Sequence, residues 1–129
     1  MQEIKGQETK GPSQGHRVNL PELLDRVDDD RELLGDLLSI FKEDFPGHLR
    51  ALREAVARQD MKQAMVVSHT LKGMLSNLAV TKAAASAAQL EQLAGGGGEV
   101  PLKEALAAFE REVEGLLPEM ETYMTKVQS

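Results

Sequence analysis

The stretch Asp60–Leu78, DMKQAMVVSHTLKGMLSNL, decides the fold because its apolar residues recur with the period of a helix. Asp60 is a residue type that caps helix N-termini, so we expect a helix from Met61 to about Leu78. On a wheel of about 100° per residue, one broad side holds the residues expected in the core: Met61, Ala64, Val67, Ser68, Leu71, Met74, Leu75 and Leu78.

Two helices are expected before this stretch. Asn19 and Pro21 favour the start of a short leading helix, and Asp28–Asp30 can cap a longer helix over residues 31–59. The pair Pro46–Gly47 should kink or break the longer helix, because proline lacks the backbone donor that a helix interior uses.

Two further helices are expected after the stretch. Thr81 can cap a helix over residues 82–94, which the run Gly95–Gly98 ends. A last long helix is expected over residues 101–126, starting at a proline and kinked at Pro118.

The whole pattern predicts an all-α protein. No segment alternates with period two, and short loops between long helices make neighbouring helices antiparallel. The expected fold is an up-down-up-down four-helix bundle with a short leading N-terminal helix, over residues 19–127. Residues 1–18 are rich in glycine and poor in apolar side chains, so we expect a flexible tail or linker there.

Composition narrows the function. A net charge of −6 and a pI of about 5.1 argue against nucleic acid as a partner, since phosphate binding needs clustered basic residues. The chain has no cysteine, which excludes disulfides and thiolate metal sites. No apolar run approaches the length of a membrane span and no secretion signal is visible, so we expect a cytoplasmic protein without direct membrane contact.

His69 points away from the expected core side of its helix and is therefore predicted to face solvent. Its surroundings are unusual for a solvated helix face, which would be rich in charged residues and good helix formers. Gly73 lies one turn after His69 and would give a partner protein close access to the imidazole. The other residues of this expected docking surface are Lys62, Met65, Val66, Lys72 and Ser76.

The chemistry open to His69 is narrowed by its neighbours. A metal site would want a second ligand at i+3 or i+4, where the sequence has Lys72 and Gly73, so no metal is expected. A convex helix face offers no pocket for a hydrolase triad. The remaining role is that of a nucleophile toward a phosphoryl group, whose charge Lys72 could offset.

Glu91 is the expected partner of the histidine. If the chain turns near residue 80, His69 and Glu91 are equally far from the turn and lie at the same level. A carboxylate that accepts from one ring nitrogen would orient the imidazole and leave the other nitrogen free. Gln92 or Gln89 would take this place if the register shifts, and an ordinary surface carboxylate is the alternative for Glu91.

Three segments together resemble the histidine-containing phosphotransfer (HPt) domain family. SHTLKGMLSNLAV resembles its His-x-x-Lys-Gly signature, and DRELLGDLLSIFKEDFPGHLRALREAVARQD is similar to the helical region before it. AAASAAQLEQLAGGG is similar to the helix after it, and the likeness covers about residues 19–125. Two residues depart from the family pattern. Met74 stands where the family usually has Ser or Ala, and Ala79 stands where it usually has Gly.

The resemblance implies a four-helix bundle that accepts a phosphoryl group on His69 from a receiver-domain aspartate or a kinase and passes it to another response-regulator receiver. It also implies a phosphate-facing Lys72, a docking glycine at Gly73 and a polar contact from Glu91. Such domains have no ATP site or cofactor of their own, because the receiver supplies the Mg²⁺. A hybrid sensor histidine kinase is a further candidate partner, and we expect a monomer.

Three other functions are compatible with a helical bundle. A degenerate bundle that only binds a partner is the main alternative, although intact His69, Lys72 and Gly73 speak against it. The dimerisation helices of a sensor kinase would show an acidic residue after the histidine and a nearby Thr-Pro, whereas Thr70 follows here. An enzyme with its own active site is not favoured, because no acid–base pair or metal constellation is visible.

Overall fold

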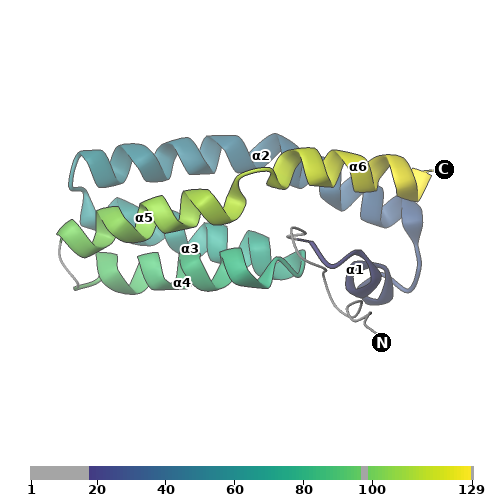
Figure 1. Ribbon diagram of the computed structural model, residues 1–129, viewed down its shortest axis with the longest axis horizontal. Coiled ribbons are helices and arrows are strands. Elements are labelled where there is room, and N and C mark those ends of the chain that lie inside the picture. The colour runs from purple at the N-terminus through teal and green to yellow at the C-terminus, as the bar shows by residue number, and fades with distance from the viewer. Residues whose placement is uncertain (1–17, 97–98, 129) are drawn as a thin grey trace, which may run out of the picture.

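The computed structural model describes residues 18–96 and 99–128, which form an elongated helical bundle (Figure 1). No strand occurs in these residues, and the predicted all-α bundle with a short leading helix is confirmed. The helices are α1 Leu20–Arg26, α2 Arg31–Ala57, α3 Met61–Asn77, α4 Thr81–Ala94, α5 Glu99–Val113 and α6 Leu116–Gln128. The expected tail, except for its last residue, and the glycines at 97 and 98 lie outside the described residues.

The helices α2, α3, α4 and α5 pack in chain order, and the chain returns to α2 mainly through α6, with a smaller contact from α5, to close the bundle. The side chains expected inside from the α3 pattern do lie there: Ala64, Val67, Ser68, Leu71, Leu75 and Leu78 are buried, while Met61 and Met74 are half-buried against the core. Across the described ranges, no helix combines the length and the apolar character that crossing a membrane requires.

The long helix α2 runs through Pro46 without a break, so of the two predicted effects, a kink or a break, the break is wrong. Phe41 and Phe45 precede the proline, stacked with their ring centroids 4.9 Å apart, and Leu52 follows it in the same core. Burial of these side chains on both sides of Pro46 outweighs a proline cost of about 3 kcal/mol.

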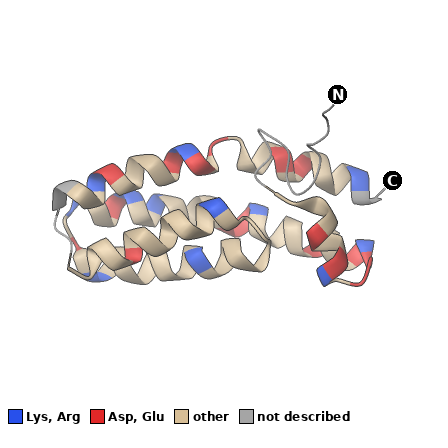
Figure 2. Ribbon diagram, turned by 60° about the horizontal axis from the view of Figure 1, so that its bottom comes forward, with Lys and Arg blue, Asp and Glu red and all other residues tan. Residues whose placement is uncertain are grey.

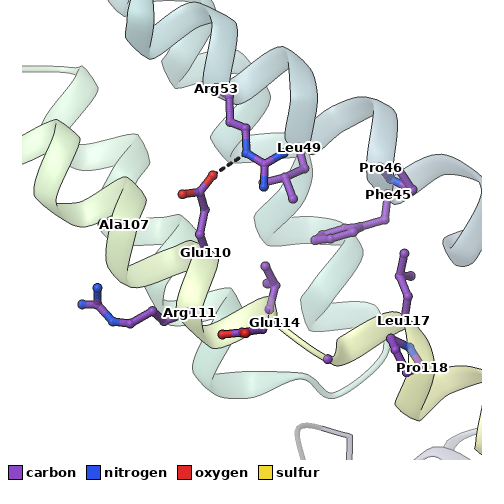
Figure 3. A pocket seen from close by; sticks show the side chains of 12 residues that line it. Phe45, Pro46, Leu49, Arg53, Ala107, Glu110, Arg111, Glu114, Leu117 and Pro118 are labelled. Atoms are coloured by element: carbon purple, nitrogen blue, oxygen red, sulfur yellow. Dashed lines mark hydrogen bonds and ion pairs between the residues drawn. The ribbon is translucent and has the colours of Figure 1, made fainter.

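The last helix is broken into two, and the break lies earlier than expected. Gly115 has φ 81°, the left-handed conformation that commonly ends a helix, and its carbonyl accepts from Glu119 N–H in the first turn of α6. Pro118 sits in that first turn, where its missing donor costs nothing, and therefore makes no kink. Beside the break lies a pocket of about 600 Å³, lined among others by Phe45 and Leu117, with the Arg53–Glu110 ion pair at its edge (Figure 3).

Three helix starts follow the predicted capping residues and one does not. The side chains of Asn19, Asp30 and Asp60 each accept a backbone N–H in the first turn of α1, α2 and α3. Thr81, the predicted cap of α4, is instead its first helical residue, and Val80 occupies the cap position without a side-chain hydrogen bond. The N–H of the buried Val80 donates to Leu75 O in the turn that closes α3, and α4 begins at the next residue, one residue earlier than predicted.

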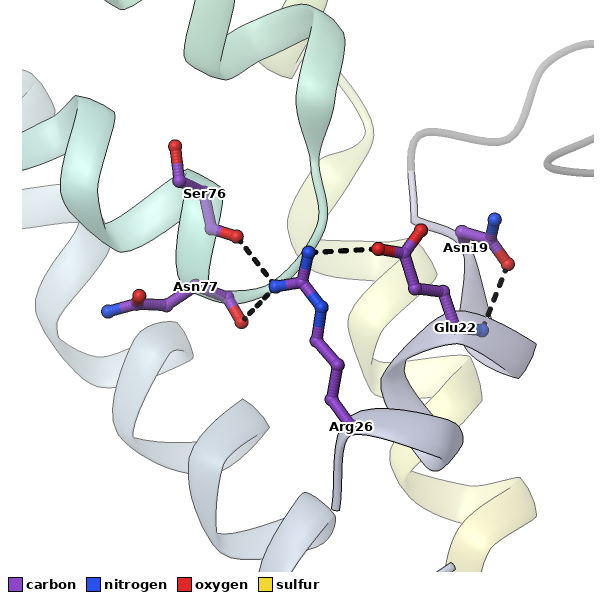
Figure 4. A network of polar contacts seen from close by, with 5 residues as sticks. All are labelled: Asn19, Glu22, Arg26, Ser76 and Asn77. Atoms are coloured by element: carbon purple, nitrogen blue, oxygen red, sulfur yellow. Dashed lines mark hydrogen bonds and ion pairs between the residues drawn. The ribbon is translucent and has the colours of Figure 1, made fainter. Parts of the chain in front are cut away.

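The N-terminal segment contacts two parts of the bundle, the start of α6 and the end of α3. Val18, assigned from the sequence to the end of the tail, is buried, and its N–H donates to Glu119 Oε2 at 3.0 Å. At the other end of α1, Arg26 Nη1 donates to the carbonyls of Ser76 and Asn77 at 2.9 and 3.2 Å (Figure 4). Since the last carbonyls of a helix lack partners within it, Arg26 caps α3.

Candidate functional site

His69 lies in the middle of α3, on the side turned away from the core. It falls outside the side of α3 that holds the buried residues of this helix, Ala64, Val67, Ser68, Leu71 and Leu75. The imidazole side chain is 66% exposed. It is therefore open to a macromolecular partner.

Glu91 on α4 lies next to this histidine. Its Oε2 is 2.9 Å from His69 Nδ1, and its other oxygen, Oε1, is 2.8 Å from Lys72 Nζ. The hydrogen bond from Lys72 is the main reason that the pKa of Glu91 lies below its ordinary value of 4.5, and the bond with His69 lowers it further. The carboxylate is thus ionised at neutral pH and can only accept.

This contact sets the state of the imidazole. Because an ionised carboxylate accepts at Nδ1, that nitrogen carries the proton in the neutral ring, and Nε2 keeps its lone pair. The arrangement gives an exposed, oriented nitrogen that can act as a nucleophile.

Lys72 occupies a different place from the one that a simple helical wheel suggests. Its side chain is only 35% exposed and reaches across to α4, where it pairs with Glu91. An ammonium group has three donors, so this pairing leaves Lys72 able to bind a further acceptor near the ring.

Gly73 lies on the exposed side of α3, one turn after His69. A Cβ built at this position would meet no heavy atom within 4 Å. Neither packing within the molecule nor a left-handed backbone therefore requires a glycine here. The space beside Gly73 is therefore free for a partner molecule that approaches from solvent.

The other residues predicted to form the docking surface are all exposed. Met65 and Val66 have exposed fractions of 37% and 50%, and Lys62 and Ser76 are exposed as well. The structure thus places them with His69 and Gly73 on the outer side of α3; their role in docking stays a prediction.

The hairpin formed by α3 and α4 carries a net positive charge, whereas the rest of the chain is acidic. Residues 61–96 hold Lys62, Lys72 and Lys82 but only one acidic residue, Glu91, so they carry a formal charge of +2. The whole chain carries −6, and the remaining residues therefore carry −8. Figure 2 shows the acidic residues gathered on the other helices, notably around α1 and the start of α2.

Sequence reasoning missed two of these contacts. The pairing of Lys72 with Glu91 could have been suspected, because Glu91 is the one carboxylate that α3 and α4 offer. The capping of α3 by Arg26 joins residues 50 and 51 positions apart, and no local pattern indicates it.

Comparison with known proteins identifies the family. The family model described as the Hpt domain matches residues 36–128, which is most of the chain. No curated protein and no solved structure matches. The family performs histidine-containing phosphotransfer in two-component signalling, and its members interact with receiver domains and kinases. The exposed His69 and its ordered partner Glu91 lie within the matched region, and the chain belongs to the histidine-containing phosphotransfer (HPt) domain family.

Proposed function

We propose that this protein is a phosphorelay intermediate: His69 accepts a phosphoryl group from a receiver-domain aspartate or a kinase and passes it to another response-regulator receiver. The observation that carries the proposal is the exposed imidazole whose Nδ1 is held by the Glu91 carboxylate. This geometry presents Nε2 as the reactive nitrogen on a surface with no intramolecular obstacle at Gly73.

The transfer follows from this arrangement. Nε2 attacks the phosphorus of an aspartyl phosphate, an N–P bond forms, and the P–O bond to the aspartate breaks, releasing its carboxylate. The ring keeps its proton on Nδ1 and becomes cationic, so Glu91 lies opposite a developing positive charge. The reverse reaction with a second receiver returns the imidazole to its neutral state.

Glu91 and Lys72 act at different stages of the transfer. Glu91 orients the nucleophile before transfer, and Lys72 offers donors to the phosphoryl oxygens afterwards while remaining next to Glu91. The domain needs no nucleotide site or cofactor of its own in this scheme, because the receiver supplies an activated phosphoryl group together with Mg²⁺.

A test without a partner uses phosphoramidate, a small phosphoryl donor. Incubation should add one acid-labile phosphoryl group, detected by intact mass, and His69→Gln should lose it while keeping a wild-type circular dichroism spectrum. A phosphoryl group that persists on His69→Gln would place the reactive residue elsewhere. If phosphoramidate modifies His69 but no receiver exchanges phosphate with it, the interaction-only alternative is favoured.

The role of Glu91 is tested by the tautomer of the ring. Nitrogen NMR of wild type should show Nδ1 protonated in the neutral ring, and Glu91→Ala should shift the population toward the other tautomer. Glu91→Gln is the matched control, because an amide oxygen can still accept from Nδ1. An unchanged tautomer in Glu91→Ala would mean that Glu91 does not orient His69.

A further inference from the structure

Three large apolar side chains lie exposed in a row on the first half of α2. Leu33, Leu37 and Ile40 have exposed fractions of 44%, 37% and 56%. Their i, i+4, i+7 spacing places them along one flank of the helix. We call these three residues the α2 stripe. It lies outside the surface around His69, which belongs to α3 and α4.

The fold explains why this flank stays uncovered. Helix α2 has 27 residues and the antiparallel α3 only 17, so α3 ends before it reaches the start of α2. Helices α5 and α6 pack on another flank, where Arg53 pairs with Glu110 and Lys42 with Glu121. The α2 stripe is thus exposed although its three side chains are all large and apolar.

Carboxylates border the α2 stripe. Asp36 lies three residues after Leu33, Asp44 lies four after Ile40, and both are exposed. Asp30, the N-cap of α2, lies at the other end. The border is therefore acidic, whereas the surface around His69 carries lysines.

We propose that the α2 stripe is a second docking surface, which binds a basic amphipathic helix of a partner protein independently of His69. An apolar row at helical spacing fits the apolar face of another helix, and lysines or arginines beside that face would meet Asp36 and Asp44. A second copy of this chain fits less well, because it would bring the same carboxylates together. The family match begins at Asp36, so Leu33 and the cap Asp30 precede the matched region.

The proposal is tested with a synthetic helical peptide that has leucines at i, i+3, i+4 and i+7 flanked by lysines. A control peptide carries glutamates in place of the lysines. In ¹H–¹⁵N NMR titrations of the full chain, the lysine peptide should shift amides of residues 33–44, and its affinity should fall as salt is added. Leu37→Gln/Ile40→Gln should weaken its binding about tenfold, because most of the newly buried apolar area is lost. Equal binding of the glutamate peptide, or shifts confined to α3 and α4, would overturn the proposal.

A double comparison separates this surface from the one around His69. Leu37→Gln/Ile40→Gln should exchange phosphate with a receiver at the wild-type rate, while Val66→Gln should slow that exchange and leave peptide binding unchanged. If the α2 double variant slows receiver exchange as much as Val66→Gln does, the stripe belongs to the receiver's docking surface and the proposal fails. The proposal would also be overturned if sedimentation showed that the wild-type protein is a dimer and that Leu37→Gln/Ile40→Gln is a monomer.

Discussion

Substitution of Gly73 should separate the stability of α3 from the function of its outer surface. A Cβ at this position meets nothing within 4 Å, and the backbone is ordinary helix, so alanine adds no internal clash and a longer side chain can start from open space. Glycine in a helix interior costs about 1 kcal/mol relative to alanine. Gly73→Ala should therefore raise the free energy of unfolding by about 1 kcal/mol, and the melting temperature by about 4 °C for a domain of this size.

The same substitutions should impair transfer in proportion to their bulk, on the function proposed here. A receiver that fits closely over the bare backbone at Gly73 would have to move aside for a larger side chain. Overfilling a close-packed contact costs about 1–3 kcal/mol, and about 1.4 kcal/mol corresponds to a tenfold change. Gly73→Gln should lower kcat/KM for transfer from a receiver to His69 about tenfold, and Gly73→Ala should lower it less.

The assay follows loss of label from a phosphorylated receiver in rapid-quench experiments, with thermal unfolding measured on the same samples. Gly47 in α2 is a matched control, since a Cβ there also meets nothing within 4 Å. Gly47→Gln should give a similar gain in stability and leave transfer unchanged. Transfer by Gly73→Gln at the wild-type rate, or equal slowing by Gly47→Gln, would refute the docking argument.

Three further outcomes are expected. Lys72→Ala should shorten the lifetime of phosphohistidine by a factor of about 2–5, most clearly at low ionic strength, because an exposed ion pair contributes about 0.5–1 kcal/mol; the decay is followed by ³¹P NMR. Ala79→Gly should raise the free energy of unfolding by up to about 1 kcal/mol, seen as a higher urea midpoint, because Ala79 holds a left-handed φ of 58°. Burial, with Glu119 nearby, raises the pKa of Tyr123 from 10.0 to about 12. The folded state then keeps this proton longer than the unfolded chain, so stability should fall as pH rises through 10 to 12, and Tyr123→Phe should lack that part of the fall.

The sequence predicts best the features that local interactions decide. Asn19, Asp30 and Asp60 cap their helices as expected, because a cap depends on a few consecutive residues. The contact between His69 and Glu91 could be anticipated from a turn near residue 80, since two antiparallel helices joined by a short turn have little freedom of register.

The features that local patterns missed depend on competition between local and tertiary preferences. Pro46 does not break its helix, because packing holds it in place, and Pro118 is not the site of the later break, because Gly115 has already ended the helix before it. Conversely, Ala79 takes a left-handed conformation that a glycine would adopt more easily. The passage of α2 through Pro46 depends on contacts between distant helices, which no window of the sequence contains, whereas Gly115 is a local signal for the end of α5.

The double contact of Glu91 changes how the roles of Lys72 and His69 should be viewed. Considered separately, Lys72 would be a mobile cation waiting for phosphate, and Glu91 a carboxylate reserved for the ring. The structure gives each carboxylate oxygen its own partner, so the ammonium is already held beside the imidazole before any phosphoryl group arrives. Ordering a free lysine side chain costs up to about 2 kcal/mol of rotamer entropy, much of which this pairing meets in advance. On the proposed function, Glu91 would therefore prepare the nucleophile and the phosphate-binding cation at once.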